Sequence, residues 1–210
     1  AQLVHRKIQG EFSLVSWSEV AHCLYPHRYR PRESPVGRSA LRGQIRPQAE
    51  GDPPCPVQLS TPIGSFWARR GEEDLFAHLL GEQLEDHIYQ RDPVTVRPGD
   101  VVLDVGGHLG TFTRIALRQG ARLVVAFEPE PVNRSCFQRT FQSEIAEKRV
   151  VLVEAAAWSE PGELKFTIWP DNSAGASSVL TPPGSSVAVP AVTIDDTVDR
   201  LGLERVDFIK

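Results

Sequence analysis

The stretch VVLDVGGHLGTFTRIAL at residues 101–117 decides the fold of this chain. Its first residues form an apolar run interrupted only by Asp104, which predicts a fully buried strand at residues 101–105. A glycine-rich turn follows at residues 106–110, and the sequence after it predicts a helix over residues 111–119. In open α/β sheets, ligands bind beyond the carboxyl ends of the strands. The stretch therefore predicts a ligand site at the turn.

Three glycines shape this turn. Gly106 and Gly107 can adopt backbone angles closed to other residues, and they let a ligand lie close to the main chain. Gly110 would let the following helix approach the strand closely.

A second acidic residue ends the next predicted strand. Glu128 lies 18 positions after Gly110, within the segment AFEPEP. An acidic residue about 20 positions beyond a glycine turn is placed to bind both hydroxyls of an adenosine ribose. A carboxylate suits that task because it accepts two hydrogen bonds at once.

These features fit either a dinucleotide or S-adenosylmethionine. A dinucleotide site has the pattern G-x-G-x-x-G, bare of side chains so that pyrophosphate can lie at the helix N-terminus. Here Asp104 stands in the place of the first glycine, where a carboxylate would repel pyrophosphate but attract the cationic amino group of a methionine moiety. We therefore favour S-adenosylmethionine over NAD. A third possibility is that Asp104 caps a turn in a scaffold that binds no ligand.

The rest of the chain after residue 94 alternates between strands and helices. A helix is predicted from Pro131 to about Lys148, with proline in its first turn. Strands are predicted at residues 122–130, 149–158 and 162–169, and a strand, a short helix from near Asp195 and a last strand follow within residues 189–210. Alternation of this kind implies crossover connections. We expect an α/β fold with a Rossmann-like, doubly wound, mostly parallel sheet.

The preceding segment has a different pattern. Residues 57–69 predict a short hairpin, and residues 71–90 predict a helix. The apolar face of that helix would contain Leu75, Phe76, Leu79, Leu80, Leu84 and Ile88. Residues 1–56 are rich in Pro, Gly and Arg in their second half, and we expect an irregular N-terminal extension rather than a nucleic-acid-binding arm. The domain itself is expected at residues 57–210.

Composition limits the function classes. Hydrophobic residues make up 40% and charged residues 24%, which is ordinary for a globular protein, and no apolar run approaches the ~20 residues that span a bilayer. A net charge of -4 gives no global reason to expect nucleic acid. Cys23, Cys55 and Cys136 are odd in number and widely spaced, which argues against disulfides or a metal site and favours a cytoplasmic protein.

From about Thr61 to Lys210 the chain resembles the FkbM-type methyltransferases, a branch of the class I S-adenosylmethionine-dependent enzymes. The resemblance is carried by VRPGDVVLDVGGHLGTFT, VVAFEPEP, VVLVEAAAWSEPGELKF, the SAGASSVL loop and VTIDDTVDRLGLERVDFIK, in that order. It implies a seven-stranded Rossmann-like sheet. It also implies methyl transfer, usually to an oxygen of a sugar, lipid or polyketide-like acceptor.

The resemblance also implies roles for particular residues. Cofactor contacts are expected from Asp104, Gly106, Gly107, Gly110 and Glu128, from the backbone of His108, and, near the adenine, from Glu154, Ala155 and Ala156. The family usually has a small residue or asparagine where Glu154 stands. The polar loop with Asn172, Ser173 and Ser177 is either a contact for the acceptor or a solvated loop.

In the family, the strand ending in Ile-Lys continues into an acidic D-x-E-G segment, whereas this sequence stops at Lys210. We therefore expect the polypeptide to continue beyond Lys210, and no general base can be named. The alternatives are a catalytically inactive Rossmann-like binding module and, less favoured, an NAD-dependent oxidoreductase. The acceptor and the oligomeric state are open.

Overall fold

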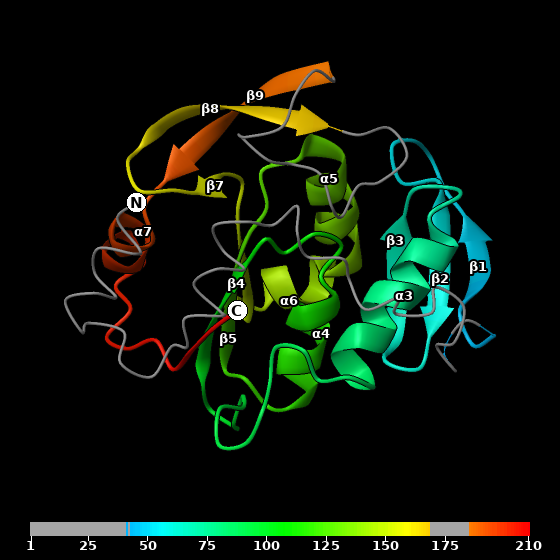
Figure 1. Ribbon diagram of the computed structural model, residues 1–210, viewed down its shortest axis with the longest axis horizontal. Helices are drawn as coiled ribbons and strands as arrows, with labels where there is room; N and C mark the ends of the chain where they lie inside the picture. The colour runs from blue at the N-terminus through cyan, green and yellow to red at the C-terminus, as the bar shows by residue number, and fades with distance from the viewer. Residues whose placement is uncertain (1–40, 42, 169–184) are drawn as a thin grey trace, which may run out of the picture. The chain divides into compact units, whose positions relative to one another are not determined.

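The computed structural model describes residue 41, residues 43–168 and residues 185–210 (Figure 1). All of them belong to one compact unit, Ser39–Lys210. Within the described residues, no helix is long and apolar enough to cross a membrane.

A four-stranded parallel sheet lies at the centre of the unit. Its order is β10-β4-β5-β6, and every neighbouring pair is parallel. The strands are β4 (Val101–Val105), β5 (Leu123–Phe127), β6 (Val150–Val153) and β10 (Phe208–Ile209). The chain runs outward from β4 through β5 to β6, and then returns to the other side of β4 as β10. The strand order therefore reverses between β4 and β10. The carboxyl ends of these two strands form a topological switch point, which is where open α/β sheets bind ligands.

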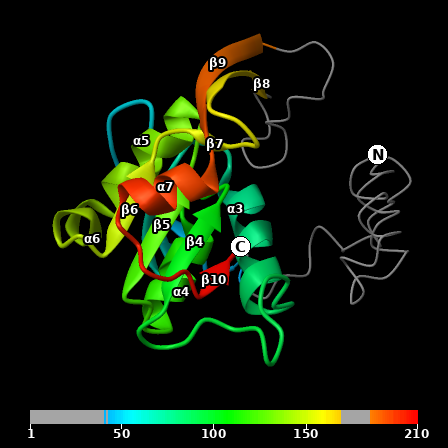
Figure 2. The ribbon, with the colours of Figure 1, turned by 90° about the vertical axis from the view of Figure 1, so that its left-hand side faces the viewer.

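Helices cover both faces of this sheet. Successive side chains along each strand point to opposite faces, and because the side chains on both faces are apolar, each face packs against helices in its own core. Val102, Val124 and Ala126 point into one core, which contains residues of α4 (Thr111–Arg118) and α5 (Pro131–Thr140). Leu103, Val125 and Phe127 point into the other, beside α7 (Ile194–Arg200) (Figures 1 and 2). The expected doubly wound α/β fold is confirmed.

A small antiparallel sheet and a helix pack beyond α5. The sheet order is β1-β2-β3, and the elements are β1 (Arg46–Glu50), β2 (Val57–Thr61), β3 (Gly64–Ala68) and α3 (Glu73–Leu84). The hairpin β2–β3 is confirmed, and Phe66, Phe76 and Leu80 are buried in the core that α4 and α5 share. Strand β1 falls in the segment where the sequence suggested an irregular path. Ile88 is 42% exposed and lies beyond the end of α3, so it does not extend the helix's apolar face.

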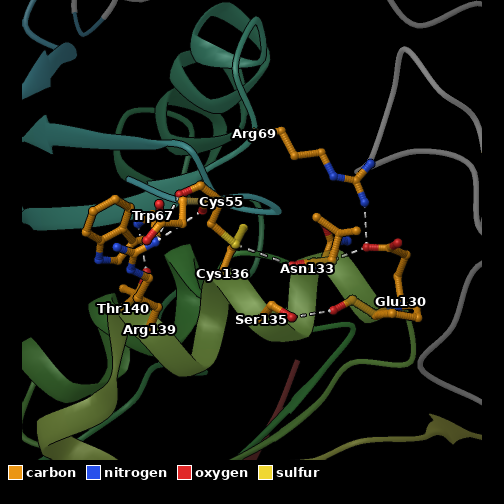
Figure 3. Close-up of a disulfide and its surroundings, with 12 residues drawn as sticks. Cys55, Trp67, Arg69, Glu130, Asn133, Ser135, Cys136, Arg139 and Thr140 are labelled. Atoms are coloured by element: carbon orange, nitrogen blue, oxygen red, sulfur yellow. Dashed lines mark hydrogen bonds and ion pairs between the residues drawn. A yellow bond between two sulfur atoms is a disulfide. The ribbon is translucent and has the colours of Figure 1, made fainter. Parts of the chain in front are cut away.

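Cys55 and Cys136 form a disulfide between the residue two positions before β2 and the middle of α5 (Figure 3). The expectation that the cysteines form no disulfide is therefore wrong. The two residues are 81 positions apart in sequence, and only the packing of the small sheet on α5 brings their Cα atoms to 5.5 Å. Both cysteines are buried. The cysteine pattern consequently gives no support to a cytoplasmic location.

A third sheet, of order β7-β9-β8, stands apart from the central one. Its strands are β7 (Ala156–Ala157), β8 (Gly162–Ile168) and β9 (Ser185–Val192), with β8 and β9 antiparallel. The strand predicted at residues 149–158 therefore breaks after Val153. Within the described residues the parallel sheet has four strands rather than seven. The predicted helix from Pro131 to Lys148 also divides, at Phe141, into α5 and α6 (Gln142–Ala146).

Candidate cofactor site at the carboxyl edge of the parallel sheet

The four parallel strands end at the same edge of the central sheet. Gly106, Glu128, Glu154 and Lys210 are the residues that directly follow β4, β5, β6 and β10. Three of these four residues are in the predicted cofactor set. The sequence motifs therefore lead to residues that share this edge, but they did not single out Lys210.

Asp104 is completely buried and both of its carboxylate oxygens have partners. The hydroxyl of Thr113, on α4, donates to Oδ2 at 2.6 Å, and the ammonium of Lys210 lies 2.9 Å from Oδ1. A buried carboxylate is stable only when it is paired in this way. Direct contact between Asp104 and a cofactor stays a prediction, and in this structure the partners of Asp104 come from the protein.

The glycines of the turn have different surroundings. Gly106 has φ +79°, and a Cβ placed there would have no atom within 4 Å, so there is room for a ligand beside its backbone. Gly110 has φ +89°, and a Cβ there would lie 2.1 Å from Cε2 of Phe141. Gly107 is intermediate, with 3.3 Å to Cβ of Ala126. Gly106 thus borders open space, whereas Gly110 is required for close packing against the ring of Phe141.

His108 is tied to Glu128 through its backbone. Its N–H donates to Oε2 of Glu128 at 2.7 Å, and its φ of +51° is unusual for a residue other than glycine. Burial, followed by the charges of Lys210 and Arg69, lowers the pKa of the imidazole to about 3. The side chain of His108 is therefore neutral at physiological pH.

Glu128 lies against the turn with its carboxylate only slightly exposed. Besides His108, the backbone N–H of Glu130 donates to Oε1 at 2.9 Å, and Nδ2 of Asn133 lies 3.5 Å from the same oxygen. Burial raises the pKa of Glu128, although these hydrogen bonds oppose the shift. Each carboxylate oxygen has two acceptor lone pairs. Oε2 therefore keeps one for a hydroxyl donor, and Oε1 accepts a second hydroxyl if the long contact with Asn133 at 3.5 Å gives way.

Arg69 and Glu130 support this arrangement from outside the glycine turn. Nη2 of Arg69, which directly follows β3, lies 2.6 Å from Oε2 of Glu130, and the same oxygen accepts the N–H of Asn133 (Figure 3). Glu130 thereby caps α5, whose first turn holds Asn133 beside Glu128. Sequence reasoning missed both residues because Arg69 is 61 positions from its partner and follows the last strand of the small sheet.

Lys210 connects the ends of two neighbouring strands. Its Nζ lies 2.7 Å from the carbonyl oxygen of Gly106 and 5.1 Å from the centre of the Tyr89 ring, in addition to its ion pair with Asp104. The side chain is only 11% exposed. Its position at the end of the last predicted strand was the available signal, but the sequence does not reveal that this strand pairs with β4.

The residues expected near the adenine are divided between two environments. The carboxylate of Glu154 points toward α5, where it accepts from Nη1 of Arg134 at 3.0 Å and from Nε2 of Gln138 at 2.8 Å. Ala155 and Ala156 are buried in apolar clusters. The predicted acceptor residues Asn172, Ser173 and Ser177 lie outside the described residues.

An open groove of about 870 Å³ begins at the ends of β4 and β10. It is lined by Val105 and Ile209, by the segment 157–159 and by residues 193–196 at the start of α7. Trp158, which is 46% exposed, and Asp195 both face this groove. It is large enough for part of a cofactor or for an acceptor.

The part of the chain that carries this site is similar to known proteins. The family model of the methyltransferase FkbM domain matches residues 104–210, about half of the chain. The 31-O-demethyl-FK506 methyltransferase FkbM of Streptomyces tacrolimicus is 36% identical over 94 residues, a match that covers 44% of this chain and 35% of the relative. The chain therefore matches about a third of the length of this curated relative.

Among solved structures, the methyltransferase FkbM of Methylobacillus flagellatus KT is similar with a TM-score of 0.33 and 13% identity, covering 61% of this chain and 34% of the other. A similarity of this size does not establish the fold, which rests on the strand order and the two helical layers described above. The family match begins at Asp104 and extends through the glycine turn, Glu128 and Lys210. The chain belongs to the FkbM methyltransferase family.

Proposed function

We propose that this chain is part of an S-adenosylmethionine-dependent methyltransferase that transfers a methyl group to an oxygen of a small-molecule, sugar or lipid acceptor. The observation that carries the proposal is the position of Glu128. Backbone N–H groups of His108 and Glu130 hold its carboxylate against the glycine turn, in a chain of a methyltransferase family.

The side chains at this edge fit an adenosine-containing cofactor. Glu128 would accept the two ribose hydroxyls, and Gly106 would allow the main chain to lie against the ligand because a Cβ there would meet open space. When bound, S-adenosylmethionine supplies a methyl group on a positively charged sulfur. The protein's part is to orient the acceptor oxygen toward that methyl group, since alignment accounts for much of the rate of such transfers.

The curated relative from Streptomyces tacrolimicus supports oxygen as the acceptor atom. The name of the Streptomyces tacrolimicus protein gives its substrate as 31-O-demethyl-FK506, a compound that lacks a methyl group on the oxygen at position 31. The groove beside Val105 and Ile209 is lined in part by these two apolar residues and is large enough for a ring-sized acceptor. A deprotonating group would be needed where the acceptor is a hydroxyl of ordinary acidity.

The choice between S-adenosylmethionine and NAD rests on the family more than on the charge of Asp104. Because Lys210 balances that charge, Asp104 would repel a pyrophosphate less than an unpaired carboxylate would. The two cofactors must therefore be separated by measurement.

Calorimetric titration tests the proposal. We expect S-adenosylmethionine and S-adenosylhomocysteine to bind the protein with a stoichiometry near one, and NAD to give no saturable heat. Binding of NAD without binding of either sulfur compound would overturn the proposed function. Binding of both sulfur compounds without methyl transfer to any acceptor would instead favour a binding module.

A further inference from the structure

We propose that Lys210 is a positioning residue of the glycine turn, and that Lys210, rather than the ligand, balances the charge of Asp104. The inference rests on the proposed cofactor. It assigns Asp104 an indirect effect on binding, exerted through Lys210 and the backbone of the turn, in place of a contact with the ligand's amino group.

The backbone geometry fixes where Lys210 begins. The N–H of Lys210 donates to the carbonyl of Leu103 at 2.9 Å, and the N–H of Val105 donates to the carbonyl of Lys210 at 3.1 Å. These two bonds continue the parallel pairing of β10 with β4 as far as the turn. The side chain of Lys210 therefore starts beside the last residues of β4.

The ammonium of Lys210 bonds the two parts of the β4–turn junction. It lies 2.9 Å from Oδ1 of Asp104 and 2.7 Å from the carbonyl oxygen of Gly106, and the Val105 carbonyl is 3.5 Å away. Gly106 is also the residue whose φ of +79° directs the turn away from the strand. One charged group thus connects the buried carboxylate to the backbone that a ligand would touch.

Burial excludes a direct contact in this arrangement. Asp104 has 0% exposed surface, its Oδ2 accepts the hydroxyl of Thr113, and its Oδ1 faces Lys210. A ligand ammonium could reach the carboxylate only by displacing Lys210, which would leave a second buried cation beside the same group. Removing one partner of a buried ion pair is strongly unfavourable because the other charge is left uncompensated.

Two ligands separate the indirect effect from a direct contact. S-adenosylhomocysteine has an amino group and a carboxylate, whereas 5′-methylthioadenosine lacks both and keeps the adenosine. If Asp104 and Lys210 position the turn, then Asp104→Asn and Lys210→Met should each weaken both ligands by a similar factor, of about tenfold or more. If Asp104 binds the amino group, Asp104→Asn should weaken S-adenosylhomocysteine alone.

Affinities are measured by calorimetry on the full polypeptide, well below the melting temperature of each variant. Lys165→Met, at an exposed lysine of β8, is the matched control and should leave both affinities unchanged. The double variant Asp104→Asn with Lys210→Met removes both charges, and its loss of affinity should be smaller than the product of the two single losses. A role in stability alone would lower the melting temperature but leave the affinity of the folded protein unchanged, and that result would overturn the inference.

If Asp104→Asn does not fold, a smaller change beside Asp104 tests the same inference. Thr113→Val removes the hydroxyl that orients Asp104, and Thr113→Ser keeps it. We expect both ligands to weaken together in Thr113→Val and to be retained in Thr113→Ser.

A selective loss of S-adenosylhomocysteine in either the Asp104 or the Thr113 variant would overturn the inference, as would strictly multiplicative losses in the double variant. Failure of the wild-type protein to bind either ligand would instead overturn the proposed function.

Discussion

At the scale of single residues, the charges around the glycine turn decide its chemistry. Glu128 is kept against the turn by two backbone donors, whereas Asp104 is covered by Lys210 and Thr113. The sequence singled out both acidic residues as site residues. Asp104 is the last residue but one of the apolar strand β4, and Glu128 directly follows the apolar strand β5. The sequence could not predict their different partners, since Lys210 is 106 positions away from Asp104 in the chain.

Glu128→Ala removes the acceptors proposed for two ribose hydroxyls. Hydrogen bonds to a charged group contribute about 1.5–3 kcal/mol each, so affinity for S-adenosylhomocysteine should fall by at least about tenfold.

Because the pKa of Glu128 is raised, affinity should be full above that pKa and decline as the pH falls through it, at a higher pH than for an ordinary carboxyl. Calorimetry across pH checks both effects. Glu85→Ala, at an exposed position, is the control, and unchanged affinity in Glu128→Ala would contradict the proposed role.

His108 should make the fold sensitive to acid. Its pKa is about 3 in the folded chain against an ordinary value of 6.5, so the unfolded state binds the extra proton between these values. Stability from this group is therefore complete above pH 6.5 and falls by up to about 1.4 kcal/mol per pH unit below it. Urea unfolding of His108→Asn, which suits a positive φ, should show a flatter dependence on pH than the parent. An unchanged dependence would mean that folding does not lower the pKa of His108.

At the scale of elements, the turn between β4 and α4 has two properties. It leaves open space beside Gly106, where a ligand could lie, and it packs Gly110 closely against the ring of Phe141. The strand, turn and helix of this element were predicted correctly because all three depend on local pattern. The small sheet is different. The sequence does not indicate β1, since its pairing with β2 depends on register rather than on an apolar run, and every residue of β1 is exposed.

Two glycine variants separate these two properties of the turn. Gly110→Ala places a Cβ 2.1 Å from Phe141 at a positive φ, so it should lower the free energy of unfolding by about 3 kcal/mol or more. Gly106→Ala meets open space and should cost about 1–2 kcal/mol from backbone strain alone. Relative to its loss of stability, Gly106→Ala should nevertheless weaken ligand binding more than Gly110→Ala does. Denaturant unfolding and calorimetry on both variants provide the test, and equal losses of stability would contradict the described packing.

At the scale of the whole described unit, the small antiparallel sheet is fastened to the parallel sheet through α5. Besides the Arg69–Glu130 ion pair, this connection includes the Cys55–Cys136 disulfide and the stacking of the Arg139 guanidinium 3.4 Å from the centre of the Trp67 ring. The backbone N–H of Trp67 also donates to the hydroxyl of Thr140. These contacts join segments that are far apart in the chain, so residue spacing offered no sign of them. The family resemblance, in contrast, predicted the central sheet because its motifs lie on the strands of that sheet.

Reduction of the disulfide should destabilise this unit. A crosslink that closes a long loop typically contributes about 2–5 kcal/mol, chiefly by restricting the unfolded chain. Dithiothreitol should therefore lower the melting temperature of the wild-type protein, whereas it should leave the Cys55→Ala, Cys136→Ala double variant unchanged. Cys23→Ala is the control and should respond to reductant like the wild type. Equal melting temperatures of the wild-type protein with and without reductant would contradict the disulfide.

The edge formed by the glycine turn and Glu128 is the proposed location of the cofactor, on which the other proposals depend. A crystal structure of the protein with S-adenosylhomocysteine measures that location directly. We predict both ribose hydroxyls within hydrogen-bonding distance of the Glu128 carboxylate, the ligand against the backbone of Gly106, and Lys210 still paired with Asp104. A ribose bound away from Glu128, or an adenosine on another face of the sheet, would contradict this location.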